Sequence, residues 1–259
     1  MRYFLLIFIP LLWISSGVAG SYLFKKDLYT NCEIITDKDP TILQNLLFVE
    51  EKLIKFWDRR KAHMSGGWQM TNFKAFIFTA VMKEGEDIIV RVNAEFKNRD
   101  DARVQALKYS TMVGQLPNFL RSNLKTITIH KGNKAWGGGN NDILIHTGFK
   151  YARDNCNEEL MLHESGHTSL DEDWGGLVDS KLWKKAAVAD GMYISKYAKR
   201  FSNREDVAET INWWIGVRCF PKRISPLNYE KILEAIPNRL EYLDKQNFDT
   251  YPLTCQTIK

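Results

Sequence analysis

The sequence has few of the residues that most often form metal sites and disulfides. Its 259 residues include five histidines and four cysteines. No two cysteines have the close spacing of a cysteine-rich metal site, which argues against such a site. No Asn-x-Ser/Thr acceptor is present, so we expect no N-linked glycan. No internal repeat, low-complexity tract or Pro/Ser-rich linker occurs, which argues against independently folded modules.

The N-terminus has the pattern of a secretory signal peptide. Arg2 precedes an apolar run over residues 3–13, and small residues follow it. The alternative is an uncleaved membrane anchor, but this run is shorter than the roughly 20 residues that a bilayer span needs. We therefore expect residues 1–20 to be a signal peptide that is cleaved after Ala19 or Gly20.

The expected mature chain, residues 21–259, contains no later stretch that is long and apolar enough to span a membrane. Its length suits one compact domain or two lobes sharing a cleft, and we expect a single secreted domain. The formal charge of +5 falls to +4 when Arg2 leaves with the signal peptide. Because this excess is mild and spread along the chain, we expect no nucleic-acid partner.

An even number of cysteines in an exported chain predicts two disulfides. Three pairings of Cys32, Cys156, Cys219 and Cys255 are possible. We favour Cys219 with Cys255, which closes a loop over the C-terminal segment, and Cys32 with Cys156, which ties the N-terminus to the middle of the chain.

The first half of the expected mature chain is rich in strand patterns. Residues 73–82 and 88–96 contain many β-branched and aromatic side chains, and they flank a turn-forming segment at 83–87. This arrangement predicts a β-hairpin. Residues 101–112 have apolar positions at helical spacing after an acidic start, and a short helix is expected over 117–124.

Two more strands are expected at 125–130 and 142–147. The loop between them contains Gly-Gly-Gly-Asn-Asn at 137–141. A glycine-rich loop can bind phosphate, but here no Gly-Lys-Ser/Thr follows and no helix begins after it. We therefore interpret this loop as a flexible hairpin connection.

From residue 155 onward the pattern is mostly helical. Asn155 and Glu158 match a capping box, and the helix they begin is expected to run through His167 and to end before Gly175. Further helices are expected at 180–189, 203–217 and 227–243. A strand-rich half followed by a helical half indicates an α+β fold.

The segment 163–167 reads His-Glu-Ser-Gly-His. On a helix, His163 and His167 project about 40° apart and one turn apart, so both imidazoles can reach one metal ion. Glu164 points to the side of this pair, where it can accept a proton from an activated water. The alternative is an ordinary helix with two surface histidines. However, the neighbouring residues are uncharged, which favours a buried helix whose polar groups need a ligand.

A catalytic zinc site needs a third protein ligand. Asp171 and Asp173 follow the motif closely, but the metzincin style of site needs a glycine at the position of Leu170. Glu205 is the better candidate, because Glu205 and Glu209 lie four residues apart at the edge of an apolar helix face. Such a pair of carboxylates needs a cationic partner, which zinc would supply. Asp171 and Asp173 remain alternatives.

In these residues the sequence resembles the gluzincins, a group of zincin metallopeptidases whose glutamate ligand lies on a second helix downstream of His-Glu-x-x-His. The resemblance covers residues 158–209 only. It implies that Glu205 is the third ligand and that Glu209 supports His163 or His167. Tyr197, followed by alanine, is similar to the arrangement in lethal-factor-like peptidases, in which a tyrosine helps to stabilise the tetrahedral intermediate.

The same resemblance implies a zincin-like fold, in which an edge strand above the metal-binding helix pairs with an extended substrate. Residues 142–147 are the natural candidate for this strand. His130 and His146 alternate with apolar residues in the expected strands. We interpret them as cross-strand or surface histidines rather than as metal ligands.

Several of these assignments have a simpler alternative. Ser202 and Glu205 also match a capping box, so Glu205 could serve only to satisfy backbone donors. Glu209 could pair with an arginine or a lysine. Tyr193 is a rival of Tyr197 for the same role.

The sequence therefore predicts a secreted zinc metallopeptidase acting on peptides or proteins. Zn²⁺ would be held by His163, His167 and Glu205, with Glu164 as general base and Tyr197 as a donor to the oxyanion. The alternative is a non-catalytic extracellular protein, either with a structural zinc site or as a disulfide-stabilised binding domain without metal.

Overall fold

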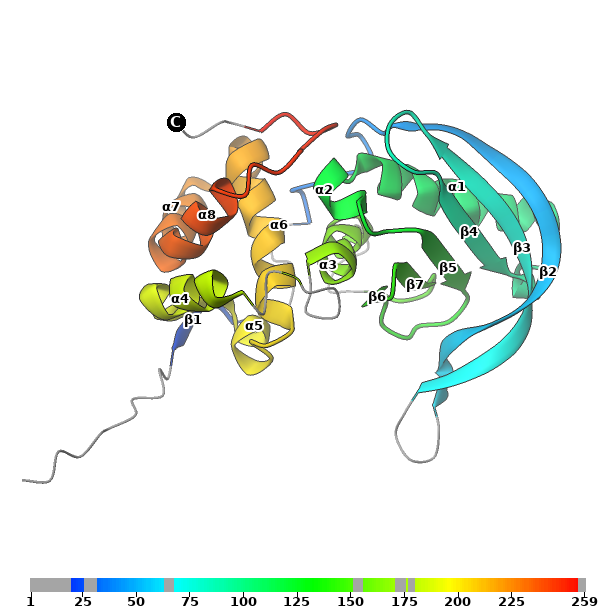
Figure 1. Ribbon diagram of the computed structural model, residues 1–259, viewed down its shortest axis with the longest axis horizontal. Helices are drawn as coiled ribbons and strands as arrows, with labels where there is room; N and C mark the ends of the chain where they lie inside the picture. The colour runs from blue at the N-terminus through cyan, green and yellow to red at the C-terminus, as the bar shows by residue number, and fades with distance from the viewer. Residues whose placement is uncertain are drawn as a thin grey trace, which may run out of the picture.

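The structure, a computed structural model, describes residues 20–25, 32–62, 68–150, 156–170, 176 and 180–255. Apart from Gly20, the expected signal peptide lies outside these residues. Every helix in the described part of the chain is too short or too polar to cross a membrane. Strands predominate in the first half and helices in the second (Figure 1), so the mixed α and β composition agrees with the prediction.

Six strands form the main sheet, in the order β2-β3-β4-β5-β7-β6. β3 is antiparallel to both of its neighbours, β2 and β4; β4, β5 and β7 are parallel, and β6 is antiparallel to β7. The bounds are β2 (Leu43–Ala62), β3 (Trp68–Met82), β4 (Ile88–Asn93), β5 (Thr126–His130), β6 (Gly137–Gly139) and β7 (Asp142–His146).

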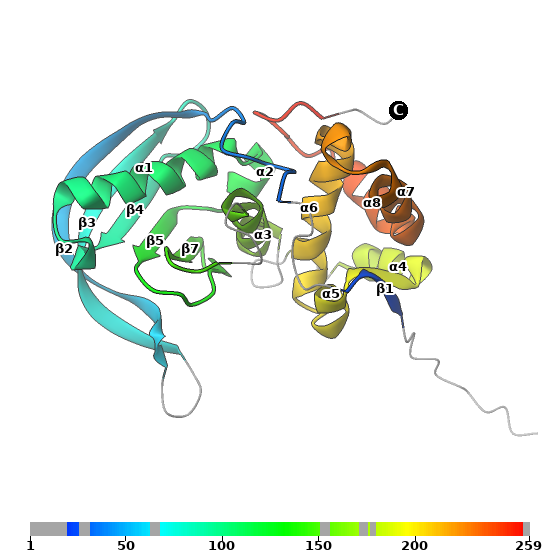
Figure 2. The ribbon, with the colours of Figure 1, turned by 180° about the vertical axis from the view of Figure 1, so that it is seen from behind.

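One face of this sheet packs against a long helix. Buried and more exposed side chains alternate along β4, so Ile88, Val90 and Val92 are buried on the same face of the strand. α1 (Arg99–Gln115) packs along β4 (Figure 2), and its Ala106 belongs to the same apolar core. The burial of each large apolar side chain there stabilises the fold by about 1.5–3 kcal/mol.

The predicted hairpin over 73–82 and 88–96 is confirmed as β3 and β4. Its second strand ends earlier than predicted, because the Asn93 side chain accepts a hydrogen bond from the Glu95 amide and caps a 3-10 helix, η1 (Ala94–Phe96). β2 is the longest strand and is not among the predicted elements, because charged residues interrupt its apolar pattern.

The glycine-rich segment differs from the prediction. β5 and β7 are parallel, so the segment between them is not a hairpin connection, and Gly137–Gly139 forms strand β6. β7 lies between β5 and β6, so the edge strand is β6 and not the expected 142–147. A side chain at Gly138 would collide with the Glu164 carbonyl, so glycine is what lets this strand approach the helix.

The predicted motif helix is α3 (Asn157–Leu170), and it is buried along most of its length. It lies between the sheet and the C-terminal helices in both views (Figures 1 and 2). It packs against α6, β6 and the short α2 (Asn118–Arg121), which is shorter than the helix expected over 117–124. Asn155, the expected cap, lies outside the described residues.

The C-terminal half is helical as predicted, but the helix expected over 227–243 is two helices. The chain breaks at Ile236, because Pro237 lacks the N–H that a continuous helix needs and instead begins a new one. The helices are α4 (Lys181–Asp190), α5 (Lys196–Arg200), α6 (Glu205–Cys219), η4 (Pro221–Arg223), α7 (Pro226–Ala235) and α8 (Pro237–Asp244).

A strand pairing and a disulfide help to tie the N-terminal segment to the rest of the molecule. β1 (Ser21–Phe24) pairs in parallel with β8 (Met192–Ser195). The Cys32–Cys156 disulfide joins the N-terminal segment to the residue before α3, and Cys219–Cys255 closes the C-terminal loop. Both disulfides match the predicted pairing.

Candidate metal centre

Two helices bring the sequence-predicted ligands together. α3 carries His163 and His167 one turn apart, and α6 begins at Glu205. The helices cross closely at Gly166, where an added Cβ would lie 3.3 Å from the Ala208 Cα. The small residues at this crossing place the first turn of α6 beside the histidines.

The three donor atoms lie close to one another. The His163 Nε2 and His167 Nε2 atoms are 3.1 Å apart. The Glu205 Oε2 atom is 3.0 Å from the His167 Nε2 and 3.3 Å from the His163 Nε2. All three residues are buried, with exposed fractions of 3%, 8% and 3% for His163, His167 and Glu205.

This arrangement fits a metal ion. Donor atoms around a tetrahedral zinc ion, at about 2.0–2.1 Å from it, are separated from one another by about 3.3 Å. The observed separations are close to this value, and two imidazoles with one carboxylate are a common ligand set. The group of His163, His167 and Glu205 can therefore hold a metal ion.

The other group of potential ligand atoms in the described chain is Cys32, Cys156 and Glu159. Its two cysteines form a disulfide. The Glu159 carboxylate accepts a hydrogen bond from the Ile34 amide. These residues therefore join two segments of the fold and are not a free ligand set.

The two oxygens of Glu205 have different surroundings. Oε2 faces the histidines, whereas Oε1 accepts hydrogen bonds from the Arg204 Nε at 2.9 Å and the Tyr197 hydroxyl at 3.2 Å. Burial alone would raise the pKa of Glu205, but its hydrogen bonds with His163 and His167 lower that pKa well below the usual range. Glu205 is therefore an ionised ligand candidate.

Glu209 lies one helical turn after Glu205 and is also buried. Its Oε1 is 3.4 Å from the His163 Nδ1, and its Oε2 accepts a hydrogen bond from the Ser195 hydroxyl at 2.6 Å. Glu209 was expected to support either His163 or His167, and in the structure it lies beside His163. A carboxylate on the far nitrogen fixes the orientation of an imidazole whose other nitrogen faces a metal.

Glu164 has a separate anchor. Its Oε2 accepts a hydrogen bond from the Gly138 amide of β6 at 2.6 Å, and the residue is buried. It does not belong to the group of three donor atoms. The edge strand therefore holds the Glu164 carboxylate beside the candidate ligands rather than among them.

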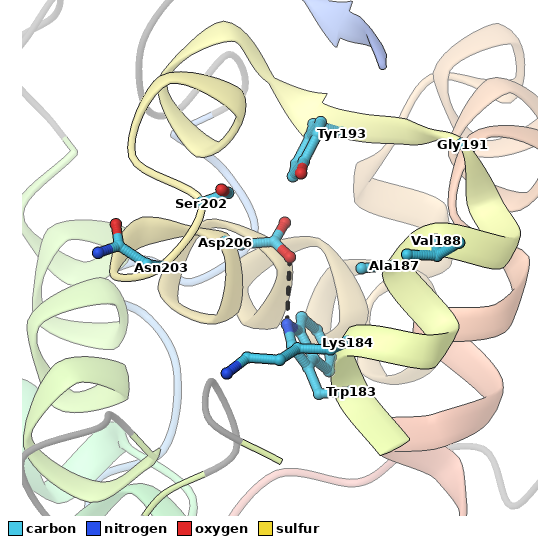
Figure 3. A pocket seen from close by; sticks show the side chains of 9 residues that line it. All are labelled: Trp183, Lys184, Ala187, Val188, Gly191, Tyr193, Ser202, Asn203 and Asp206. Carbon is cyan, nitrogen blue, oxygen red and sulfur yellow. Dashed lines mark hydrogen bonds between the residues drawn. The ribbon is translucent and has the colours of Figure 1, made fainter. Parts of the chain in front are cut away.

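Tyr197 and its rival Tyr193 face different surroundings. The Tyr197 hydroxyl donates to Glu205, and burial together with this carboxylate raises the pKa of Tyr197 to about 12. Tyr193 lines a separate cavity beside Trp183 (Figure 3). The geometry therefore favours Tyr197 as the tyrosine of the centre.

The remaining alternatives for the third ligand can be compared with the structure. Asp171 and Asp173 lie outside the described residues. The capping box of Ser202 and Glu205 is not formed, because α6 has Arg204 at its N-cap and no side-chain cap. His130 and His146 are cross-strand neighbours as predicted, on β5 and β7, and they are fully buried rather than exposed.

Arg59 is a residue near the centre that the sequence did not reveal. It lies in β2 and donates hydrogen bonds to the carbonyls of Ala135 and Trp136. Burial lowers the pKa of Arg59, whereas the negative charges of Glu164 and Glu205 raise it. No local motif marks this arginine, because β2 comes near the centre only when the strands of the sheet have paired.

Comparison with known proteins adds no relative: no protein-family model matches the chain, and no curated protein or solved structure matches it. What this centre does must therefore be inferred from its own geometry. That geometry brings His163, His167 and Glu205 to one point and keeps Glu164 beside them.

Proposed function

We propose that this protein is a secreted zinc-dependent metallopeptidase. One observation carries the proposal: the Nε2 atoms of His163 and His167 and the Oε2 atom of Glu205 are buried and lie 3.0–3.3 Å from one another. This ligand set leaves a fourth tetrahedral position for water or substrate, as catalytic zinc sites do. Glu164, beside this group, adds the base that a purely structural zinc site does not need.

A bound zinc ion would supply Lewis acidity, which activates water and polarises a carbonyl group. His163, His167 and Glu205 would hold it, and Glu209 would keep the His163 imidazole in its ligating orientation. Glu164 accepts the proton of the attacking water and returns it to the leaving amine. Tyr197 remains protonated at neutral pH, and its hydroxyl, which donates to Glu205 in the structure, would turn to donate to the oxyanion of the tetrahedral intermediate.

The test replaces Glu164 by Gln and measures both peptide cleavage and zinc content. We expect turnover to fall by about 10²- to 10⁴-fold while zinc stays near one per chain, because the base is lost and the ligands remain. Glu158→Gln is the matched control, since Glu158 is also a buried glutamate of α3 and lies outside the donor group. This control should retain its turnover.

Two results would contradict the proposal. If wild-type protein with one zinc per chain cleaved no member of a broad peptide library, the centre would be structural, as in the non-catalytic alternative. If Glu164→Gln kept full turnover, another group would be the base. Export is tested separately, because the N-terminal residue of protein recovered from the medium should be Gly20 or Ser21.

A further inference from the structure

A cavity of about 220 Å³ lies between α4, β8 and the first turn of α6 (Figure 3). Its walls are mainly apolar, formed by Trp183, Ala187 and Val188 of α4 and by the Tyr193 ring of β8. Val188 is 66% exposed, so the cavity opens to solvent on this side. A cavity of this size suits a small ligand or a single side chain.

The cavity contains one deeply buried charged side chain, Asp206, which is 2% exposed. The Oδ2 atom of Asp206 accepts hydrogen bonds from the Trp183 Nε1 at 3.1 Å and the Arg239 Nε at 3.0 Å. The Oδ1 atom is buried and accepts no hydrogen bond from any residue that the structure describes. Figure 3 shows the carboxylate between Trp183 and Tyr193, with one oxygen bonded to the indole and the other turned to the Tyr193 side.

The charges around Asp206 do not balance. Arg239 pairs with Asp190 at 2.9 Å and with Asp206 at 3.0 Å, and all three side chains are at most 2% exposed. Two carboxylates against one guanidinium leave one net negative charge. Lys184 lies at the rim, and Figure 3 shows its ammonium turned away from Asp206. A buried oxygen without a donor and a buried excess charge both favour a cationic hydrogen-bond donor as ligand.

We propose that this cavity binds a primary ammonium group carried on a short hydrocarbon chain. The ammonium donates to the Asp206 Oδ1 and offsets the excess negative charge. The Arg239 guanidinium already lies over the Trp183 and Tyr193 rings, at 5.7 and 5.0 Å from their centroids. These rings and Ala187 therefore supply apolar surface that packs against the hydrocarbon. Both a free alkylamine and a lysine side chain of a peptide have this chemistry. The inference does not depend on the metal, because no residue of the donor group lines the cavity.

Titration calorimetry on the purified full chain, loaded with zinc, tests the proposal. The pH is held at about 8, so that the amine and the carboxylates are charged. The probes are n-pentylamine, its neutral analogue n-pentanol, and the peptide acetyl-Gly-Lys-Gly-amide. We expect the amine to bind at least about tenfold more tightly than the alcohol, since only the amine is a charged donor. Whichever of the amine and the peptide binds more tightly identifies the source of the ammonium group.

Two variants locate the binding site. Asp206→Asn keeps the side-chain shape and removes the charge, so it should weaken amine binding by about tenfold or more. Ala187→Leu fills the cavity and should abolish binding. Its matched control is Ala189→Leu, an equal change at an exposed position of the same helix that does not line the cavity and should bind normally.

Three outcomes would overturn the proposal: equal binding of amine and alcohol, no binding of any probe to folded protein, or unchanged binding in Ala187→Leu. Folding of each variant is checked by its thermal transition, and Ala187→Leu tests the site even if Asp206→Asn fails to fold. Repeating the titration on zinc-free protein separates this inference from the metallopeptidase proposal. Amine binding should persist when the metal is absent.

Discussion

The residues that the structure describes include two buried pairs of histidines, and only one of these pairs has the geometry of a metal centre. His163 and His167 are one turn apart on a helix, and their Nε2 atoms are 3.1 Å apart with Glu205 beside both. His130 and His146 are in register on parallel strands, and their ring centroids are 5.6 Å apart. Burial of two histidines is therefore not enough to make a metal centre.

The nearby carboxylates explain the difference. Asp58 is 3.7 Å from His146, but Arg60 binds it at 2.8 Å and also binds Glu95 at 2.8 Å. Arg60 thus holds both acids of the strand pair in ion pairs, so neither carboxylate is directed at a histidine. Beside His163 and His167, Arg204 and Tyr197 contact the Oε1 atom of Glu205. The Oε2 atom of Glu205 remains directed at the two imidazoles. A directed carboxylate oxygen distinguishes a ligand set from a structural polar cluster.

The largest expected effect, on zinc affinity, comes from replacing one histidine of each pair by glutamine. His163→Gln should weaken zinc binding by more than about a hundredfold, because it removes a ligand, whereas His146→Gln should leave zinc binding unchanged. Competition with a chromophoric chelator measures both affinities. Equal loss of zinc in the two variants would remove the distinction between the two pairs.

A smaller effect is expected from the carboxylate behind the ligating histidine. Glu209→Gln should weaken zinc binding by about 10- to 100-fold, because the His163 Nδ1 loses its charged partner at 3.4 Å. The same competition assay measures this change. A zinc affinity equal to that of the wild type would mean that Glu209 serves only to hold Ser195, whose hydroxyl donates a hydrogen bond to Glu209 at 2.6 Å.

The third effect does not involve zinc binding and concerns the acid stability of the strand pair. Burial, together with the positive charges nearby, lowers the pKa of His146 from 6.5 to about 4. The unfolded chain therefore takes up a proton before the folded chain does, and stability is lost as the pH falls from about 6.5 to about 4. Relative to His146→Gln, the wild type should lose on the order of 3 kcal/mol across this window.

Urea unfolding of both proteins at a series of pH values measures this loss. Comparing the two proteins cancels other buried groups such as Asp142, whose pKa is raised by burial to about 6 and which acts with the opposite sign. A constant difference between the two proteins across the window would show that His146 titrates normally.

The sequence predicted the parts of the centre that depend on local spacing. The four-residue separation of His163 and His167 on one helix fixes their relation, and Glu205 followed from a second carboxylate one turn further on. The residues it missed come from distant strands. Arg59 and Gly138 reach the centre through the order of the strands in the sheet, which depends on pairings between distant segments rather than on any local pattern.

The fold shows the same limit. The helices at 180–189 and 203–217 could be predicted because each has its own periodic pattern, and both are found within about two residues of their expected ends. The glycine segment could not be predicted, because three glycines have no side-chain pattern. This segment becomes a strand because it pairs with β7 and packs against α3.

The contact between Gly138 and Glu164 bears on how the centre tolerates mutation. The donor to the Glu164 carboxylate is a main-chain amide, so every residue except proline would supply it at 138. Yet any side chain there collides with α3, so every substitution must move the strand and carry that amide away from Glu164. A position with no side chain of its own is thus expected to be among the least mutable in the centre.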